Sequence, residues 1–145
     1  MMKNLLVLAA LGLSGCLSCT LMYAPSTFTV QVVGAAPVEG LYQLEANGQG
    51  QTGMCVFVLP HQEDDLVSCT QNAMVNFEGD GSAVDSLVLF NFSPEFVNVR
   101  ALLDGEEVAS QSFEPEYAVD EPNGRGCGER SIGSVVFDSS RQGGR

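Results

Sequence analysis

The chain of 145 residues has no tryptophan, a single histidine and only six basic residues. Because histidine is the commonest acid–base residue and metal ligand, the lone His61 leaves few ways to build either kind of site. Eighteen acidic residues give a net charge of −12, and so acidic a chain repels a phosphate backbone, which argues against any nucleic-acid partner. Hydrophobic residues still make up 45% of the chain, which is enough apolar surface for one folded domain.

The longest apolar run, Leu5 to Leu13, has only nine residues, whereas a membrane-spanning helix needs about 20. It follows a short segment that contains Lys3, the only lysine, and it fits the hydrophobic region of an export signal. It ends in Leu13-Ser14-Gly15-Cys16, which resembles the lipobox of bacterial lipoprotein precursors. The alternative is an ordinary signal peptide that contains a cysteine.

The lipobox resemblance implies cleavage before Cys16, a diacylglyceryl group on its sulfur, an acylated amine and a membrane as partner. Residues 1–15 are then the lipoprotein signal peptide, and residues 16–25 are the lipidated cysteine with a short tether. Leu17, the next residue, is similar to that of lipoproteins sorted to the outer membrane. The mature chain keeps five arginines and 18 acids, a side-chain charge of −13, so its body is expected to stand off anionic lipid.

Five cysteines leave an even number for disulfides if Cys16 carries lipid. Two apolar runs flank a polar loop, and their antiparallel pairing sets Cys55 opposite Cys69 on one face. Cys19 and Cys127 then remain for each other, and their bridge would join the start of the domain to its end. Unpaired buried thiols are the alternative. Cys16-Leu-Ser-Cys19 has the C-x-x-C spacing of redox sites, but its first sulfur is the expected lipid site, and no other cysteine spacing is typical of a zinc or redox site.

Strand patterns recur along the rest of the chain, and no segment keeps a helical period. Strict alternation over 27–33 indicates a half-buried strand, and Asn47-Gly48 is typical of a tight hairpin turn. We predict an all-β fold: a single antiparallel β-sandwich of seven or eight strands over residues 26–138, followed by a disordered tail over 139–145. A barrel is the alternative. The expected strands are 27–33, 40–46, 51–59, 66–77, 86–92, 96–103, 106–113 and 134–137, with a long loop over 115–131.

The hairpin around Asp104-Gly105 is predicted to place Ala101 opposite Val108, with Arg100 on the other face. After this hairpin come Phe113-Glu-Pro-Glu-Tyr117, then Pro122-Asn-Gly-Arg-Gly-Cys-Gly128 and a last Val-rich strand. This order resembles small exported immunoglobulin-like or transthyretin-like sandwiches, similar to carboxypeptidase regulatory-like modules. The resemblance implies a fold class only, because a fold does not determine a function.

Candidate metal and catalytic residues are few. Glu78, Asp80 and Asp85 lie in an acidic, glycine-containing loop whose oxygens could bind calcium, although the loop lacks EF-hand spacing. His61 and Ser68 could serve a hydrolase only if an acid joined them in one cleft. Solvent-exposed loop residues are the simpler interpretation of both groups.

Four aromatic residues could line a sugar-binding surface, although core packing is the simpler interpretation: Tyr42, Phe90, Phe92 and Tyr117. No segment carries a catalytic motif or implies a cofactor. We therefore expect a non-enzymatic, lipid-anchored envelope protein that acts in surface display, in adhesion or as an accessory subunit, with a protein or glycan partner. The alternatives are a calcium- or carbohydrate-binding module and an inhibitor or minor hydrolase of the envelope.

Overall fold

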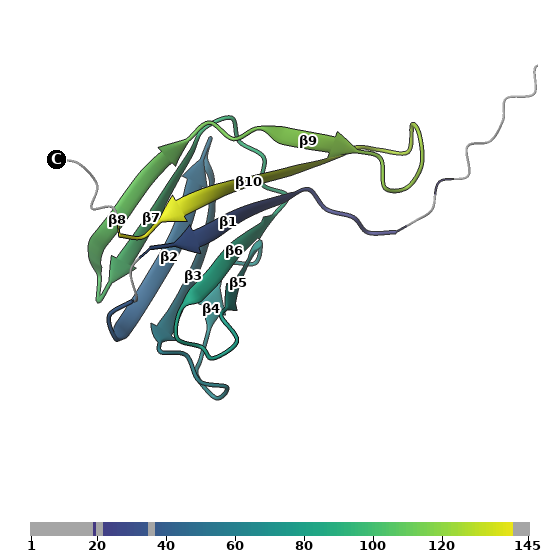
Figure 1. Ribbon diagram of the computed structural model, residues 1–145. Helices are drawn as coiled ribbons and strands as arrows, with labels where there is room; N and C mark the ends of the chain where they lie inside the picture. Colours follow the sequence, from purple (N-terminus) through teal and green to yellow (C-terminus); the bar gives the residue numbers. More distant parts are fainter. Residues whose placement is uncertain (1–18, 20–21, 35–36, 141–145) are drawn as a thin grey trace, which may run out of the picture.

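The computed structural model describes residues 19, 22–34 and 37–140. Its described part consists of strands and turns, which confirms the predicted all-β class (Figure 1). No helix in this part is long and apolar enough to cross a membrane. The strands are β1 (Thr27–Val33), β2 (Gly40–Gly48), β3 (Gln51–Leu59), β4 (Ser68–Cys69), β5 (Ala73–Phe77), β6 (Val84–Phe90), β7 (Val97–Leu103), β8 (Glu106–Phe113), β9 (Tyr117–Asp120) and β10 (Arg130–Asp138).

These strands form two five-stranded sheets. The order is β5-β6-β1-β10-β9 in the first sheet and β4-β3-β2-β7-β8 in the second. Neighbouring strands are antiparallel except β1 and β10, which run parallel with Val30 beside Val135. The prediction of a purely antiparallel arrangement is therefore wrong for this one pair. No short turn sets the relative direction of β1 and β10, because they lie at opposite ends of the sequence.

The structure describes ten strands rather than the seven or eight predicted, because two short strands escaped the sequence pattern. The expected strand 66–77 is divided, since β4 pairs with β3 whereas β5 pairs with β6 in the other sheet. Thr70 lies where the chain passes from one sheet to the other. The Thr70 N–H donates to the Met54 carbonyl at 2.8 Å, and the Thr70 carbonyl accepts from Ala73 N–H at 3.0 Å. The other addition, β9, lies inside the expected loop 115–131 and pairs with β10.

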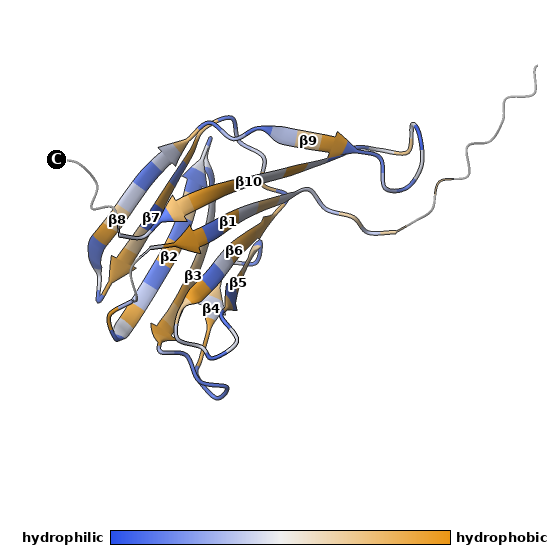
Figure 2. Ribbon diagram, in the orientation of Figure 1, coloured by the Kyte–Doolittle hydropathy of each residue, from blue (hydrophilic) through white to orange (hydrophobic). Residues whose placement is uncertain are grey.

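Inward side chains of both sheets share one hydrophobic core. Hydrophobic and hydrophilic residues alternate along β2 (Figure 2), as expected for a strand with one buried face. The two sheets are tightly packed at Gly53 of β3, where a Cβ would lie 1.6 Å from Leu89 Cδ2 of β6. The largest fully buried side chains include Phe28, Phe57, Phe92, Phe137, Leu87 and Leu89.

Tyr117 packs against this core at the edge formed by β9. Its hydroxyl donates a hydrogen bond to the Pro94 carbonyl at 2.9 Å. Burial raises the pKa of Tyr117 to about 12, so the side chain is a neutral donor at ordinary pH.

Both predicted disulfides are confirmed. Cys55 of β3 pairs directly with Cys69 of β4, and their bridge is buried at Cys55. Cys19 is bonded to Cys127 across 108 positions of sequence, and this bridge fastens the segment before β1 to the loop before β10.

The predicted register of the β7–β8 hairpin is wrong by one residue. Leu102 pairs with Glu107, but Ala101 pairs with Ala109 rather than with Val108. Val108 is thus an extra residue on β8, and the strand forms a β-bulge there. Arg100 lies on the outer face as predicted, where it meets Glu45 of β2.

Candidate functional site

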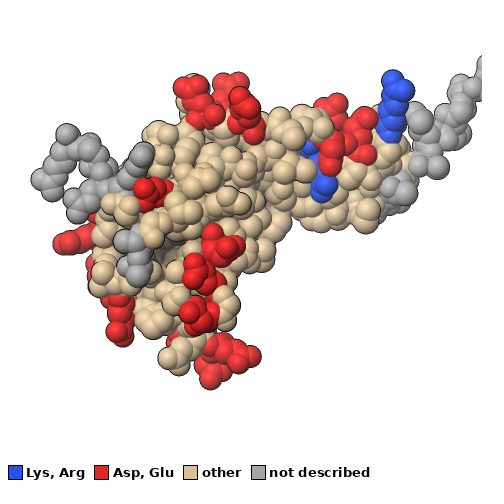
Figure 3. Space-filling view, in the orientation of Figure 1, with Lys and Arg blue, Asp and Glu red and all other residues tan. Residues whose placement is uncertain are grey.

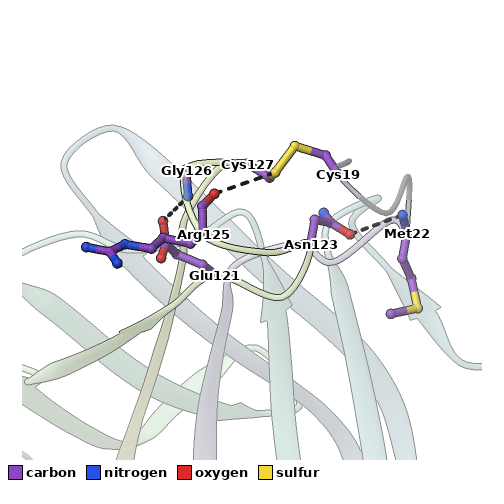
Figure 4. Close-up of a disulfide and its surroundings, with 7 residues drawn as sticks. All are labelled: Cys19, Met22, Glu121, Asn123, Arg125, Gly126 and Cys127. Atoms are coloured by element: carbon purple, nitrogen blue, oxygen red, sulfur yellow. Dashed lines mark hydrogen bonds between the residues drawn. A yellow bond between two sulfur atoms is a disulfide. The ribbon is translucent and has the colours of Figure 1, made fainter. Parts of the chain in front are cut away.

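The disulfide end of the molecule is the part around Cys19–Cys127 (Figure 4). The loop between β9 and β10 is held there by hydrogen bonds as well as by the disulfide. The Glu121 carboxylate accepts from Gly126 N–H at 2.7 Å, and Asn123 Oδ1 accepts from Met22 N–H at 3.1 Å. The segment before β1 is therefore tied to this loop at two places. Cys16, the predicted lipidation site, lies outside the described residues.

The disulfide end also carries two of the three described arginines. Arg130 makes two hydrogen bonds to Asp120, at 2.6 and 2.9 Å, and these bonds lower the pKa of that carboxyl. Arg125 forms no ion pair with any described residue, so its charge faces solvent. Among the described side chains in view in Figure 3, blue appears only at this end, whereas red acidic side chains occur over much of the visible face.

An apolar pocket of about 500 Å³ opens at the opposite end of the molecule, between the two sheets. β1 and β10 run side by side away from the disulfide end (Figure 1), and residues near the ends of both strands line the pocket. The nine residues of β10 span roughly 25–30 Å at about 3.3 Å per residue, which sets the distance between the two ends. The walls come from both sheets and include Val32, Leu44, Phe57, Leu59, Val84 and Phe137.

The bulge in β8 contributes directly to this pocket. Val108 is the unpaired residue of the bulge, and it both packs against the core and lines the pocket wall. Its partner in the predicted register, Ala101, lines the same wall from β7. Strand alternation alone would not place Val108 there, because the neighbouring Ala109 already points into the core.

Two hydroxyl groups line the pocket, and each donates a hydrogen bond to a backbone carbonyl. Tyr42 Oη donates to the Val38 carbonyl at 2.7 Å, and Ser139 Oγ donates to the Val33 carbonyl at 3.0 Å. Burial, opposed in part by the hydrogen bond to Val38, raises the pKa of Tyr42, and the charge of Asp104 raises it further. The phenol is therefore neutral at ordinary pH.

Glu78 is the one carboxylate among the described residues that line the pocket. It begins the turn between β5 and β6, where its N–H donates to the Ala83 carbonyl at 2.9 Å. The turn rests on the loop after β3, since His61 N–H donates to the Gly81 carbonyl at 2.8 Å. Gly81 has a φ of +71°, and a Cβ would lie 2.0 Å from the His61 carbonyl oxygen, so glycine is needed there. This contact fixes the turn that carries Glu78.

The structure does not gather the predicted calcium ligands into one site. Asp80 Oδ1 accepts from both N–H and Oγ of Ser82, at 2.9 and 2.6 Å, and these bonds lower the pKa of Asp80. Asp85 instead accepts from Ser86 Oγ at 3.1 Å. In the described ranges, no three histidine, cysteine, aspartate or glutamate residues form a group that could hold a metal ion.

His61 and Ser68 are likewise not joined as the hydrolase interpretation requires. The His61 ring stacks on Phe77 with centroids 3.9 Å apart, and its buried Nδ1 has no hydrogen-bond partner. Ser68 is exposed on β4, opposite Val56. No hydrogen bond links the two side chains within the described part of the chain.

The four aromatic residues considered for a sugar-binding surface do not form an exposed one. Phe92 is fully buried, whereas Tyr42 and Tyr117 pack against the core and Phe90 is half-buried. Two aromatic rings that the sequence analysis did not single out are exposed: Tyr23, at 81%, and Phe96, at 58% in a shallow groove. Phe96 precedes β7, and continued alternation along 96–103 would place it on the same outer face as Arg100.

Comparisons with protein-family models, with curated proteins and with solved structures found no match to this chain. The two ends of the molecule are therefore the features on which a functional proposal rests.

Proposed function

We propose that the protein is a non-enzymatic, lipid-anchored binding protein of the bacterial envelope. The anchor is the lipid on Cys16, within the lipobox-like Leu13–Cys16. Each buried CH₂ contributes about 0.8 kcal/mol, so two or three acyl chains on one cysteine hold a protein stably at a membrane. Adhesion, surface display and service as an accessory subunit are all forms of this binding role.

The observation that carries the proposal is the position of the Cys19–Cys127 disulfide. Cys19 is the third residue after Cys16, so the extended chain from one cysteine to the other spans at most about 11 Å. A lipid on Cys16 would thus hold the disulfide end beside the headgroups and leave the apolar pocket facing away from the membrane. The side-chain charge of −13 favours the same orientation, because anionic headgroups repel the acidic body.

We further propose one β-sandwich domain over residues 26–138 of the immunoglobulin-like or transthyretin-like class, after a signal peptide over 1–15 and a tether over 16–25. The core that both sheets share supports a single domain. Leu17, as the residue after the lipidated cysteine, supports the outer membrane as the location.

Expression of the full precursor in a Gram-negative bacterium tests the anchor. The wild-type protein is expected in the detergent-rich phase after Triton X-114 partitioning, with a lipid-modified Cys16 at its amino terminus by mass spectrometry. Globomycin, which blocks the lipoprotein signal peptidase, should cause the precursor to accumulate. Cys16→Ser is expected to move the protein to the aqueous phase.

The matched control is the double substitution Cys19→Ser with Cys127→Ser. It removes a cysteine three positions away and should leave the protein in the detergent-rich phase. A wild-type protein that stays in the aqueous phase, or a Cys16 thiol found free or in a disulfide, would contradict the anchor.

A further inference from the structure

We propose that the pocket between the sheets binds a single-chain amphiphile with a cationic head. The alkyl chain enters between the sheets, and an ammonium group remains at the mouth beside Glu78. This inference rests on the binding role proposed above but not on the lipid anchor.

The size of the pocket fits one such molecule. Small-molecule sites commonly measure about 300–1,000 Å³, and the volume here is about 500 Å³. A cavity of about 150 Å³ holds benzene, so by the same scale this pocket has room for roughly 20 non-hydrogen atoms. Dodecyltrimethylammonium, with a chain of twelve carbons, falls within that limit.

The walls of the pocket favour an alkyl chain. Val32, Leu44, Phe57 and Val84 present only carbon atoms, and transfer of each CH₂ from water to such surroundings is worth about 0.8 kcal/mol.

The hydrogen-bonding groups of the pocket disfavour an anionic head. The hydroxyls of Tyr42 and Ser139 are the donors among the lining side chains, and each already donates to a backbone carbonyl. A fatty-acid carboxylate would therefore find no free side-chain donor among the described lining residues. An ionised Glu78 offers no donor to an anionic head, whereas its charge attracts a cationic head, including a quaternary ammonium that has no N–H.

The charges around the mouth of the pocket also favour a cationic head over an anionic one. Asp104 is near enough to Tyr42 to raise the pKa of the phenol, so a second carboxylate stands near this end. The described arginines lie elsewhere: Arg100 pairs with Glu45 on the outer face of the second sheet, and Arg125 and Arg130 belong to the disulfide end. A cation at the mouth thus meets attraction without a competing positive charge among the described residues.

Isothermal titration calorimetry tests the proposal with the exported Cys16→Ser protein, which needs no detergent to stay in solution. Dodecyltrimethylammonium and laurate, each below its critical micelle concentration, are the two probes. We expect one molecule of dodecyltrimethylammonium per chain, bound at least tenfold more tightly than laurate. Glu78→Gln should weaken that binding about threefold or more, whereas Glu116→Gln removes the same charge outside the pocket and should leave it unchanged.

Two substitutions test whether the chain enters the pocket. Val108→Phe fills the pocket and should abolish binding, whereas Val58→Phe makes the same change on the outer face of the same sheet and should not. Val38 is 67% exposed at the pocket rim, so Val38→Lys should fold even if Val108→Phe does not. The added cation is expected to weaken dodecyltrimethylammonium binding and to strengthen laurate binding.

Three results would overturn the proposal. One is laurate binding as tight as that of dodecyltrimethylammonium, and another is no binding of either probe. The third is binding that Val108→Phe and Val38→Lys leave unchanged, as adsorption to the acidic surface would be. All of these measurements use a chain without the lipid, so failure of the anchor would not alter them.

Discussion

Glu45 shows how a charged side chain is kept buried on the outer face of a strand. The residue is only 4% exposed, because Arg100, Gln43 and Asn47 cover it. Burial raises the pKa of Glu45, but hydrogen bonds from these three side chains outweigh that effect, and the net pKa lies below the ordinary value of 4.5. The carboxylate therefore stabilises the fold above that pH, and the contribution is lost as the pH falls through the lowered value.

Arg100→Leu is expected to destabilise the protein by about 1–2 kcal/mol at pH 7, because it leaves a buried carboxylate without its charged partner. The loss should shrink as the pH falls from 7 toward the lowered pKa of Glu45, because a protonated Glu45 needs the arginine less. Urea unfolding at pH 7 and pH 4 measures both values. Arg130→Leu is the control, since it breaks an exposed pair with Asp120 and should have little effect at either pH. An equal loss at both pH values would contradict the role of the Glu45 charge.

At the scale of elements, β3 and β6 meet at Gly53. The position faces the core, and a side chain there would collide with Leu89 of the opposite sheet. Gly53 thus sets how closely the two sheets pack around the core on this side.

Gly53→Ala is expected to destabilise the domain by about 1–3 kcal/mol, because one added methyl group must push Leu89 aside. Thermal unfolding followed by circular dichroism measures the loss. Gly79→Ala is the control, since no atom lies within 4 Å of a Cβ at that exposed turn position. Adding Leu89→Ala to Gly53→Ala should cost less than the sum of the two single losses. Additive losses would show that the two residues do not collide.

The strands with long alternation were predictable from the sequence, and so was the Cys55–Cys69 pair, because period-two patterns report the buried face and the register. Short strands were not predictable, because the two residues of β4 and the four residues of β9 are too few to show an alternation that would assign them to a sheet. The bulge at Val108 also escaped, because an extra residue breaks the alternation on which the prediction depends. The pocket was beyond the same reasoning, since its walls combine strands far apart in sequence and alternation says nothing about unfilled space.

At the scale of the whole molecule, the proposed tether and the pocket lie at opposite ends of one domain. In the proposed lipoprotein, location in the envelope would depend on the few residues that follow Cys16. We proposed the outer membrane because Leu17 resembles the corresponding residue of lipoproteins that are sorted there.

Leu17→Asp is expected to move most of the protein from the outer to the inner membrane in an enterobacterial host. Sucrose-gradient separation of the two membranes, followed by immunoblotting, measures the distribution. Leu17→Ala keeps an apolar, uncharged residue and should leave the protein in the outer membrane. An unchanged distribution of the Leu17→Asp variant would contradict the sorting role, although the anchor itself would stand.

The parallel pairing of β1 with β10 has a mechanical consequence for a protein held by its amino terminus. Cys19 lies eight residues before β1 and Cys127 lies three residues before β10, so tension from the amino terminus can pass through the disulfide directly into β10. When the load acts after β10, the hydrogen bonds between β1 and β10 are then spared. Without the disulfide, the tension would enter through β1, and its hydrogen bonds to the parallel β10 would be loaded in shear and would have to break together.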